Sequence, residues 1–332
     1  VSHAEVLALL AGTSSVSADL RSPDAQRLAR SIAGSDAAKR LLRLDDRHDD
    51  DPDTNPSDVE AAQALEALCR LDEDAGRHAS AFLELREYRL SEGLDPAAPT
   101  LREMPAVLWR AVRDCARFAP EAEQSDPGDP ALLARCRDAI PAEHRETFDG
   151  LLDEARATYH LRDERALYSD VWAWGILRAA CLEVGTRLLR RAEPRVIEPA
   201  DALQASVAEL ASLLLEGDGP SIQELQRRGA FQRAYTTDDA PTMLGPAPDP
   251  PPPLDALPPA VGRLMGAVMT VIGVTLAGRG EKPPEDAQVL KGHPASGGVF
   301  EGPVHVIASA RDVERLPRGN ALVVGASSSA FT

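Results

Sequence analysis

The stretch SDVEAAQALEALCRLDEDA at residues 57–75 shows how most of this chain is built. Ser57 is a preferred N-terminal capping residue, and Glu60 follows three positions later, which is the pattern of a capping box. Leu65, Leu68 and Leu71 then recur at helical spacing. The stretch therefore predicts an amphipathic α-helix, and much of the surrounding sequence repeats this pattern.

Apolar residues at helical spacing also occur on both sides of this stretch. The segment 142–192 contains no proline and is longer than a normal globular helix, so it predicts two helices or one kinked helix. The fold expected from these patterns is mainly α-helical. The other predicted helices are 78–90, 103–118, 199–215, 220–235 and 260–277.

The composition excludes several classes of function. The net charge of −17 argues against a protein that binds nucleic acid through phosphate contacts, since such proteins need a basic face. It also argues against docking on an anionic membrane surface. The 43% of apolar residues in 332 is enough for a sizeable core, and this length suggests two domains.

The sequence also indicates a compartment. The four cysteines are scattered without paired or metal-site spacing, which favours free thiols in a reducing cytosol. No His, Cys or acidic spacing predicts a metal site. The first residues lack the basic and apolar regions of a signal peptide, and no apolar run reaches membrane-spanning length. We therefore expect a soluble, cytoplasmic protein.

The pattern changes near the C-terminal end. Nine of the nineteen residues from 241 to 259 are proline, which predicts an extended strap. Beyond it, VFEGPVHVIAS at 299–309 and NALVVGAS at 320–327 are β-branched and bounded by glycine, so they predict strands. We expect a helical domain at 1–240, the strap at 241–259, a connecting helix and linker at 260–285, and a further domain from 286 to 332.

The segment GHPASGGVFEGPVHVI at 292–307 resembles the entry strands of the swivelling phosphohistidine domain of phosphoenolpyruvate-utilising enzymes, which include phosphoenolpyruvate synthase and rifampicin phosphotransferase. The resemblance implies that the last domain is the first part of this α/β domain and is incomplete. The matching positions are Gly292, Pro294, Ala295, Ser296, Gly298, Gly302, Val304 and Val306.

Upstream segments resemble the same family. LREYRLSEGLDPAAPTLREMPAVL at 85–108 is similar to the helical region before the phosphohistidine domain, and 160–189 is similar to its long helix pair. The resemblance implies an enzyme that moves a phosphoryl group from ATP, with Mg²⁺, through a phosphohistidine to a small-molecule acceptor. Such a relay divides a difficult transfer into two easier ones.

The sequence lacks the parts of the family that perform the chemistry. It contains neither the G-G-x-x-S-H motif of the carrier histidine nor a Walker loop, and we find no ATP-grasp pattern. His293 and His305 do not occupy the carrier position. We therefore expect a truncated or split enzyme that is inactive alone, binds no cofactor itself and depends on a separate ATP-grasp or phosphohistidine chain.

The resemblance implies phosphate contacts at Arg162 and Arg165, because an Arg-acid pair opens a helix that faces the phosphohistidine in these enzymes. A guanidinium suits this role since its planar fork binds phosphate oxygens. Ala166 stands where the family often has lysine. The alternative interpretation is that residues 162–165 form a charged helix face.

Three aromatic residues follow this pair: Tyr168, Trp172 and Trp174. They are candidates for the acceptor pocket, and core packing is the alternative interpretation. Two functions stay open at this point. One is the acceptor-side fragment of a phosphotransferase, and the other is a non-catalytic helical module that binds a small molecule or belongs to a split enzyme. A purely structural helical protein would leave the glycine-patterned strands unexplained.

Overall fold

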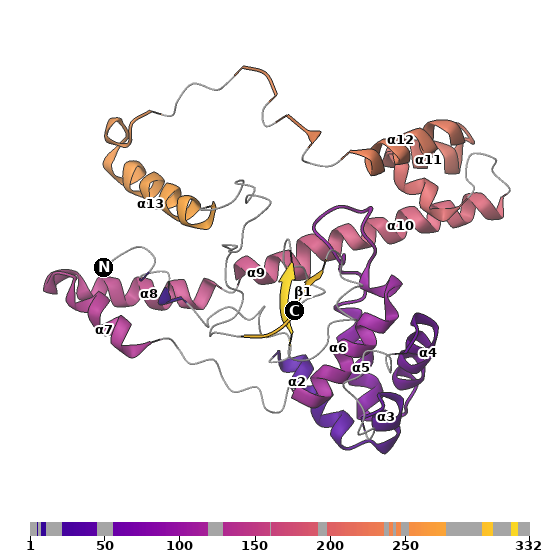
Figure 1. Ribbon diagram of the computed structural model, residues 1–332, viewed down its shortest axis with the longest axis horizontal. Helices are drawn as coiled ribbons and strands as arrows, with labels where there is room; N and C mark the ends of the chain where they lie inside the picture. The colour runs from indigo at the N-terminus through magenta and orange to yellow at the C-terminus, as the bar shows by residue number, and fades with distance from the viewer. Residues whose placement is uncertain are drawn as a thin grey trace. The chain divides into compact units, whose positions relative to one another are not determined.

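The computed structural model describes residues 5, 8–10, 22–44, 56–118, 129–159, 161–191, 198–235, 239–241, 244–246, 252–276, 301–307 and 320–324 (Figure 1). Most of these residues lie in helices, which confirms the expected mainly α-helical chain. They belong to two compact units, unit 1 (1–12, 126–155 and 241–301) and unit 2 (13–125, 156–240 and 302–332). The domain boundaries expected at 240, 259 and 285 stay predictions.

The first part of unit 2 is a helical bundle. It contains α2 (Pro23–Ala33), α3 (Asp36–Leu41), α4 (Asp58–Cys69), α5 (Asp74–Glu84) and α6 (Pro105–Phe118). The expected capping box is present, since the Ser57 hydroxyl accepts from the Glu60 N–H and the Glu60 carboxylate accepts from the Ser57 N–H. Helix α4 ends earlier than expected, and α5 begins as a separate helix within the same stretch.

The core of the bundle is apolar. Helix α2 packs on α5 and α6, and α4 packs on the same two helices. Two polar contacts tie distant segments to this core: the Trp109 indole Nε1–H donates to the Leu41 carbonyl at 3.2 Å, and Asp58 accepts from the Ala106 N–H at 3.1 Å. The buried members include Leu28, Ile32, Ala61, Leu68, Ala79, Phe82, Trp109 and Val112.

The predicted break in the segment 142–192 is confirmed. Helix α8 (Arg145–Tyr159) forms one part, and α9 (Leu161–Arg165), a π-helical turn η6 (Ala166–Asp170) and α10 (Val171–Arg190) form the other. A π-turn inserts a wider turn into the hydrogen-bond ladder and is found frequently at functional sites. The long helix of unit 2 therefore changes its winding at Tyr168 and just before Trp172 and Trp174.

Two glycines let other segments approach α10 closely. A Cβ at Gly175 would lie 1.5 Å from the Tyr88 carbonyl oxygen, and a Cβ at Gly185 would lie 2.4 Å from the Pro199 carbonyl oxygen. Pro199 begins the 3-10 helix η7 (Pro199–Gln204), which leads to α11 (Val207–Leu215) and α12 (Ile222–Ala234). Helix α10 is thus the element on which the later parts of unit 2 are assembled.

The strand predictions are confirmed over shorter ranges. Strands β1 (Val304–Ile307) and β2 (Ala321–Val324) form a parallel pair, with Val304 opposite Ala321 and Ile307 opposite Val324. Ile307 is buried, whereas Val304 and Val306 are exposed. The identity of this pair as the start of a swivelling phosphohistidine domain stays a prediction.

Unit 1 contains α7 (Pro130–Asp138), most of α8, and α13 (Pro259–Leu276) with the short helix η9 (Leu254–Ala256). A small core of Leu9, Leu132, Cys136 and Leu152 joins α7 to α8. An ion pair between Arg137 and Asp149, at 2.9 Å, supports the same hairpin. Gly262 of α13 is seated against the Leu254 carbonyl, since a Cβ there would lie 2.6 Å from that oxygen.

The substitution Gly175→Ala tests the close approach on α10. A methyl group would overlap the Tyr88 carbonyl, so we expect the free energy of unfolding of unit 2 to fall by about 3 kcal/mol or more. Urea unfolding followed by tryptophan fluorescence measures this, because Trp109, Trp172 and Trp174 all lie in unit 2. Gly150→Ala in α8, where a Cβ meets nothing within 4 Å, should leave that transition unchanged. Equal stability of the two variants would contradict the packing described for Gly175.

Candidate functional site

The segment 87–103 forms a closed loop that lies on α10. Backbone hydrogen bonds run from the Ser91 N–H to the Pro99 carbonyl at 2.8 Å and from the Leu101 N–H to the Arg89 carbonyl at 2.9 Å. A third runs from the Arg102 N–H to the Glu87 carbonyl at 2.8 Å. These bonds satisfy backbone groups that a loop would otherwise leave exposed, and they hold the side chains of the 87–103 loop in defined positions.

Glu103 is the main hydrogen-bond acceptor of this loop. Its carboxylate accepts from the Thr100 backbone N–H and from the Thr100 hydroxyl, each at 3.0 Å, as part of a capping box on the 3-10 helix η3 (Leu101–Glu103). The same carboxylate binds Arg178 of α10 through both oxygens, at 2.7 and 2.8 Å. One carboxylate thus closes the loop and attaches it to α10.

Arg178 is buried, with 7% of its surface exposed, and its hydrogen bonds match this burial. Besides the two bonds to Glu103, its guanidinium donates to the Pro96 carbonyl at 2.7 Å and the Ala97 carbonyl at 3.1 Å. A buried charge is tolerated only when it is paired and hydrogen-bonded in this way. Arg178 therefore anchors the middle of the 87–103 loop and its C-terminal end.

The electrostatics of this pair keep Glu103 ionised. Burial by itself raises the pKa of the Glu103 carboxyl, but the hydrogen bonds from Arg178 and Thr100 outweigh this and hold the pKa below its ordinary value. Because each charge is the partner of the other, this pair is suited to positioning and not to proton transfer.

Two further arginines are buried here, Arg89 within the loop and Arg86 just before it. The Arg89 guanidinium lies over the Tyr168 ring, 4.6 Å from the ring centroid, and is 2% exposed. The Arg86 guanidinium lies 3.6 Å from the Phe82 ring centroid and donates to Asp24 at 2.7 Å. Burial raises the pKa of Asp24, but the charge and hydrogen bond of Arg86 lower it by more. Cation–π contacts of this kind stabilise desolvated guanidinium groups.

The predicted aromatic residues lie on the helix that carries this loop. Tyr168 belongs to the π-turn η6 and is 39% exposed, Trp172 is half-buried in the first turn of α10, and Trp174 is 40% exposed. The positions 168, 172, 175 and 178 follow one another at intervals of four, three and three residues, so they share one face of the helix. We call this face and the 87–103 loop on it the loop–α10 seam.

The predicted phosphate contacts fall at the start of this helix. Arg165 is exposed, and its guanidinium forms an ion pair across the π-turn with Asp170 at 3.2 Å. Arg162 lies in α9, and its side chain is outside the described residues. The motif residues Gly292, Pro294, Ser296 and Gly298 also lie outside them, whereas Gly302 is described and exposed just before β1.

Sequence reasoning missed Arg89 and Arg178, which form the closest contacts of the seam. Each looked like one more arginine in an arginine-rich chain, because a helical pattern does not show which arginine lies under a loop. A signal was present in the TLRE segment at 100–103, since Thr and Glu at this spacing form a capping box that marks a fixed loop end.

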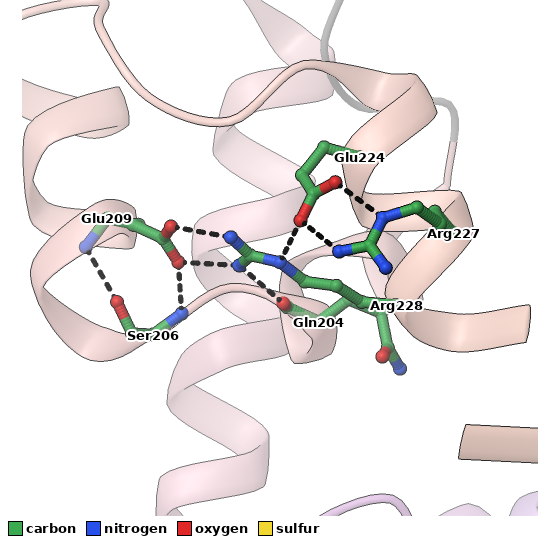
Figure 2. Close-up of polar contacts among 6 residues, drawn as sticks. All are labelled: Gln204, Ser206, Glu209, Glu224, Arg227 and Arg228. Atoms are coloured by element: carbon green, nitrogen blue, oxygen red, sulfur yellow. Dashed lines mark hydrogen bonds and ion pairs between the residues drawn. The ribbon is translucent and has the colours of Figure 1, made fainter. Parts of the chain in front are cut away.

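A second polar cluster joins η7, α11 and α12 (Figure 2). Arg228 binds both oxygens of Glu209, at 2.8 and 2.9 Å, and also donates to Glu224 at 2.9 Å and to the Gln204 carbonyl at 3.2 Å. Arg227 donates to both Glu224 oxygens, at 2.8 and 2.9 Å. Arg228 therefore connects three elements of unit 2.

The carboxylates of this cluster are held ionised. Hydrogen bonds from Arg228 and from the Ser206 backbone lower the pKa of Glu209 to about 2. Hydrogen bonds from Arg227 and Arg228 lower the pKa of Glu224 to about 2 as well. Groups with such pKa values stay charged at neutral pH, so they are poor general acids or bases. We interpret this cluster as a clasp and place the candidate site at the loop–α10 seam.

Among the described residues, no group of three or more His, Cys, Asp or Glu side chains is arranged to hold a metal ion. Within the same part of the chain, no helix has both the length and the apolar character needed to cross a membrane.

Comparisons with protein-family models, with curated proteins and with solved structures gave no match to this chain.

The substitution Glu103→Gln tests the attachment of the loop. The amide keeps the shape but leaves the buried Arg178 without its counter-charge, so we expect a loss of about 1–3 kcal/mol in the free energy of unfolding of unit 2. Fluorescence-detected urea unfolding measures it. Glu87→Gln is the matched control, because the Glu87–Arg102 pair is long, at 3.7 Å, and its arginine is exposed, so the pair should contribute little. A control that lost as much stability as Glu103→Gln would refute this assignment.

The clasp of Figure 2 predicts that the stability of α12 depends on pH. Because the folded pKa values of Glu209 and Glu224 lie below the unfolded values, their contribution is present above about pH 4.5 and is lost as the pH falls toward 2. The protection of residues 222–234 against hydrogen exchange, measured by mass spectrometry as the observed rate relative to the intrinsic rate at each pH, should therefore fall over this window. In Arg228→Gln this protection should already be lower at neutral pH and should change less between pH 5 and 3. The same pH dependence in both proteins would show that these carboxylates do not stabilise α12.

Proposed function

We propose that this chain supplies the acceptor-binding helical part of a phosphotransferase similar to phosphoenolpyruvate synthase and rifampicin phosphotransferase. In this scheme ATP and Mg²⁺ are used by an ATP-grasp part, a phosphohistidine carries the phosphoryl group, and the acceptor binds to unit 2. The sequence contains neither the G-G-x-x-S-H motif nor a Walker loop. In this proposal, ATP use and phosphohistidine formation therefore take place on polypeptide outside these 332 residues.

The observation that carries the proposal is the packing of two segments against each other. Residues 85–108 and 160–189 are the segments that resemble the helical region of this family, and they meet in the loop–α10 seam. Three contacts join them: Arg89 over the Tyr168 ring, the Tyr88 carbonyl on Gly175, and Glu103 with Arg178. Two segments that each resemble this family, and that are about 75 residues apart in the sequence, thus lie against each other.

Phosphoryl transfer needs positioning and charge balance more than covalent catalysis. In our proposal Arg162 and Arg165 on α9 contact the transferred phosphoryl group, because a guanidinium fork binds its oxygens in two places at once. Tyr168 and Trp172 lie one and two turns after this pair, and in this proposal they bind the acceptor beside the phosphoryl group. The parallel β1–β2 pair is compatible with a swivelling domain.

The alternative is a non-catalytic module, or a subunit of a split enzyme, that binds the small molecule without transferring a group. Both functions involve binding at the loop–α10 seam. Glu103, Glu209 and Glu224 are held ionised by arginines and are not free to move protons, which favours binding over proton transfer by these acids. The two functions predict different outcomes in one assay.

Transfer can be measured with the purified chain and separately produced ATP-grasp and phosphohistidine domains of a phosphoenolpyruvate-synthase-like enzyme. With β-labelled ATP, and with pyruvate or phenol as the acceptor, we expect labelled acceptor only when this chain is present. The chain alone should acquire no acid-labile phosphohistidine. Arg162→Ala should lower acceptor labelling at least tenfold while the carrier is still phosphorylated.

Arg190→Ala on the exposed end of α10 is the matched control, since it removes the same charge far along the helix and should keep full transfer. Binding of an acceptor without any labelling would support the binding module instead. Label appearing on the chain alone would contradict the proposed division of labour.

A further inference from the structure

The indole N–H of Trp172 is buried in the loop–α10 seam. Its Nε1 atom is shielded from solvent and has no hydrogen-bond acceptor among the described residues. Burying a donor in this state costs about 1–3 kcal/mol of stability. A native structure that keeps such a group calls for an explanation, and a bound ligand or water is a common one.

The other two tryptophans of the chain behave differently. The Trp109 indole N–H donates to the Leu41 carbonyl at 3.2 Å, and Trp174 is 40% exposed, so water can reach it. Trp172 thus combines a buried donor with a position in the candidate site, while Trp109 has its protein partner and Trp174 has solvent. This contrast also provides two internal controls.

The surroundings of Trp172 define what could meet this donor. It lies four residues after Tyr168 and three before Gly175, and the loop contacts the helix at both positions. One side of the Tyr168 ring carries the Arg89 guanidinium, yet Tyr168 is still 39% exposed. An accessible aromatic ring next to a buried donor suits a planar molecule with a hydrogen-bond acceptor.

We propose that the seam binds an aromatic compound that carries a carbonyl oxygen, with the aromatic ring against Tyr168 and the carbonyl oxygen accepting from the Trp172 indole N–H, once the groups that shield this N–H in the free chain have moved aside. This inference rests on the proposed function and specifies the acceptor class. In the transfer step the hydroxyl oxygen of the acceptor forms the bond to phosphorus while the P–N bond of the phosphohistidine breaks, and the freed imidazole nitrogen of the carrier takes the hydroxyl proton. A hydroxyl oxygen that accepted a hydrogen bond from Trp172 would be a weaker nucleophile, so we assign that hydrogen bond to a second oxygen. The acceptor therefore has two different oxygens, a reactive hydroxyl and a carbonyl that positions it.

The test uses two probes that differ at this oxygen. The compound 4′-hydroxyacetophenone has a carbonyl where 4-ethylphenol has a methylene group, and their sizes are nearly equal. The full chain labelled with ¹⁵N-tryptophan gives one indole N–H signal for each of its three tryptophans. We expect the Trp172 indole proton to move downfield with the ketone and not with 4-ethylphenol, while the Trp109 signal stays in place.

Variants assign the effect to the donor. Trp172→Phe keeps an aromatic ring but removes the N–H, so the affinity for the ketone should fall about tenfold, to that for 4-ethylphenol. Trp174→Phe should bind both probes as the unchanged chain does. Thermal unfolding followed by circular dichroism establishes that both variants are folded.

Three results would overturn the inference: no shift of the Trp172 signal with the ketone, equal shifts with both probes, or a Trp172 proton already downfield in the free chain, which would indicate a bound water. None of these measurements requires phosphoryl transfer. Failure of the transfer assay with a positive result here would leave a binding module, whereas transfer without a Trp172 shift would refute this ligand geometry alone.

Discussion

The burial of the Arg178 charge is the constraint on which the rest of unit 2 depends. A guanidinium that is 7% exposed needs hydrogen-bond partners, and the 87–103 loop supplies four: both oxygens of Glu103 and the carbonyls of Pro96 and Ala97. The loop cannot leave α10 without exposing this charge or leaving it unpaired, which is costly. The geometry of one ion pair thus sets the position of a segment that is remote in sequence.

Glycine makes this attachment sterically feasible. The Tyr88 carbonyl reaches α10 at Gly175, and Pro199 reaches the same helix at Gly185, so the two approaches occupy separate turns. The π-turn η6 comes directly before the first of them and brings Tyr168 under Arg89. Close backbone contact, an ion pair and a cation–π contact therefore follow one another along one helix face. The candidate site is a consequence of how the loop is seated.

The arginines of this acidic chain have two structural roles. In the clasp of Figure 2, Arg227 and Arg228 bind partly exposed carboxylates, and the contacts of Arg228 with Glu209 and the Gln204 carbonyl hold α12 against α11 and η7. In the seam, Arg89 is buried against an aromatic ring and Arg178 against a carboxylate and two carbonyls, and next to the seam Arg86 is buried against Asp24 and the Phe82 ring. In both places the described acids are kept charged. A function based on binding and positioning suits such a site better than proton transfer by these residues.

Periodicity and capping patterns in the sequence determined the helices. Ser57 with Glu60 begins a helix because their hydrogen bonds are local. The break within 142–192 was expected because the segment is longer than a normal globular helix, and it is present. The predicted aromatic residues were placed on the correct helix, although their roles stay predictions. Tertiary structure alone decided that Arg178 pairs with Glu103, that Gly175 receives the Tyr88 carbonyl, and that the Trp172 indole N–H is buried. These contacts join residues far apart in the chain, and local patterns carry no information about which distant segments meet.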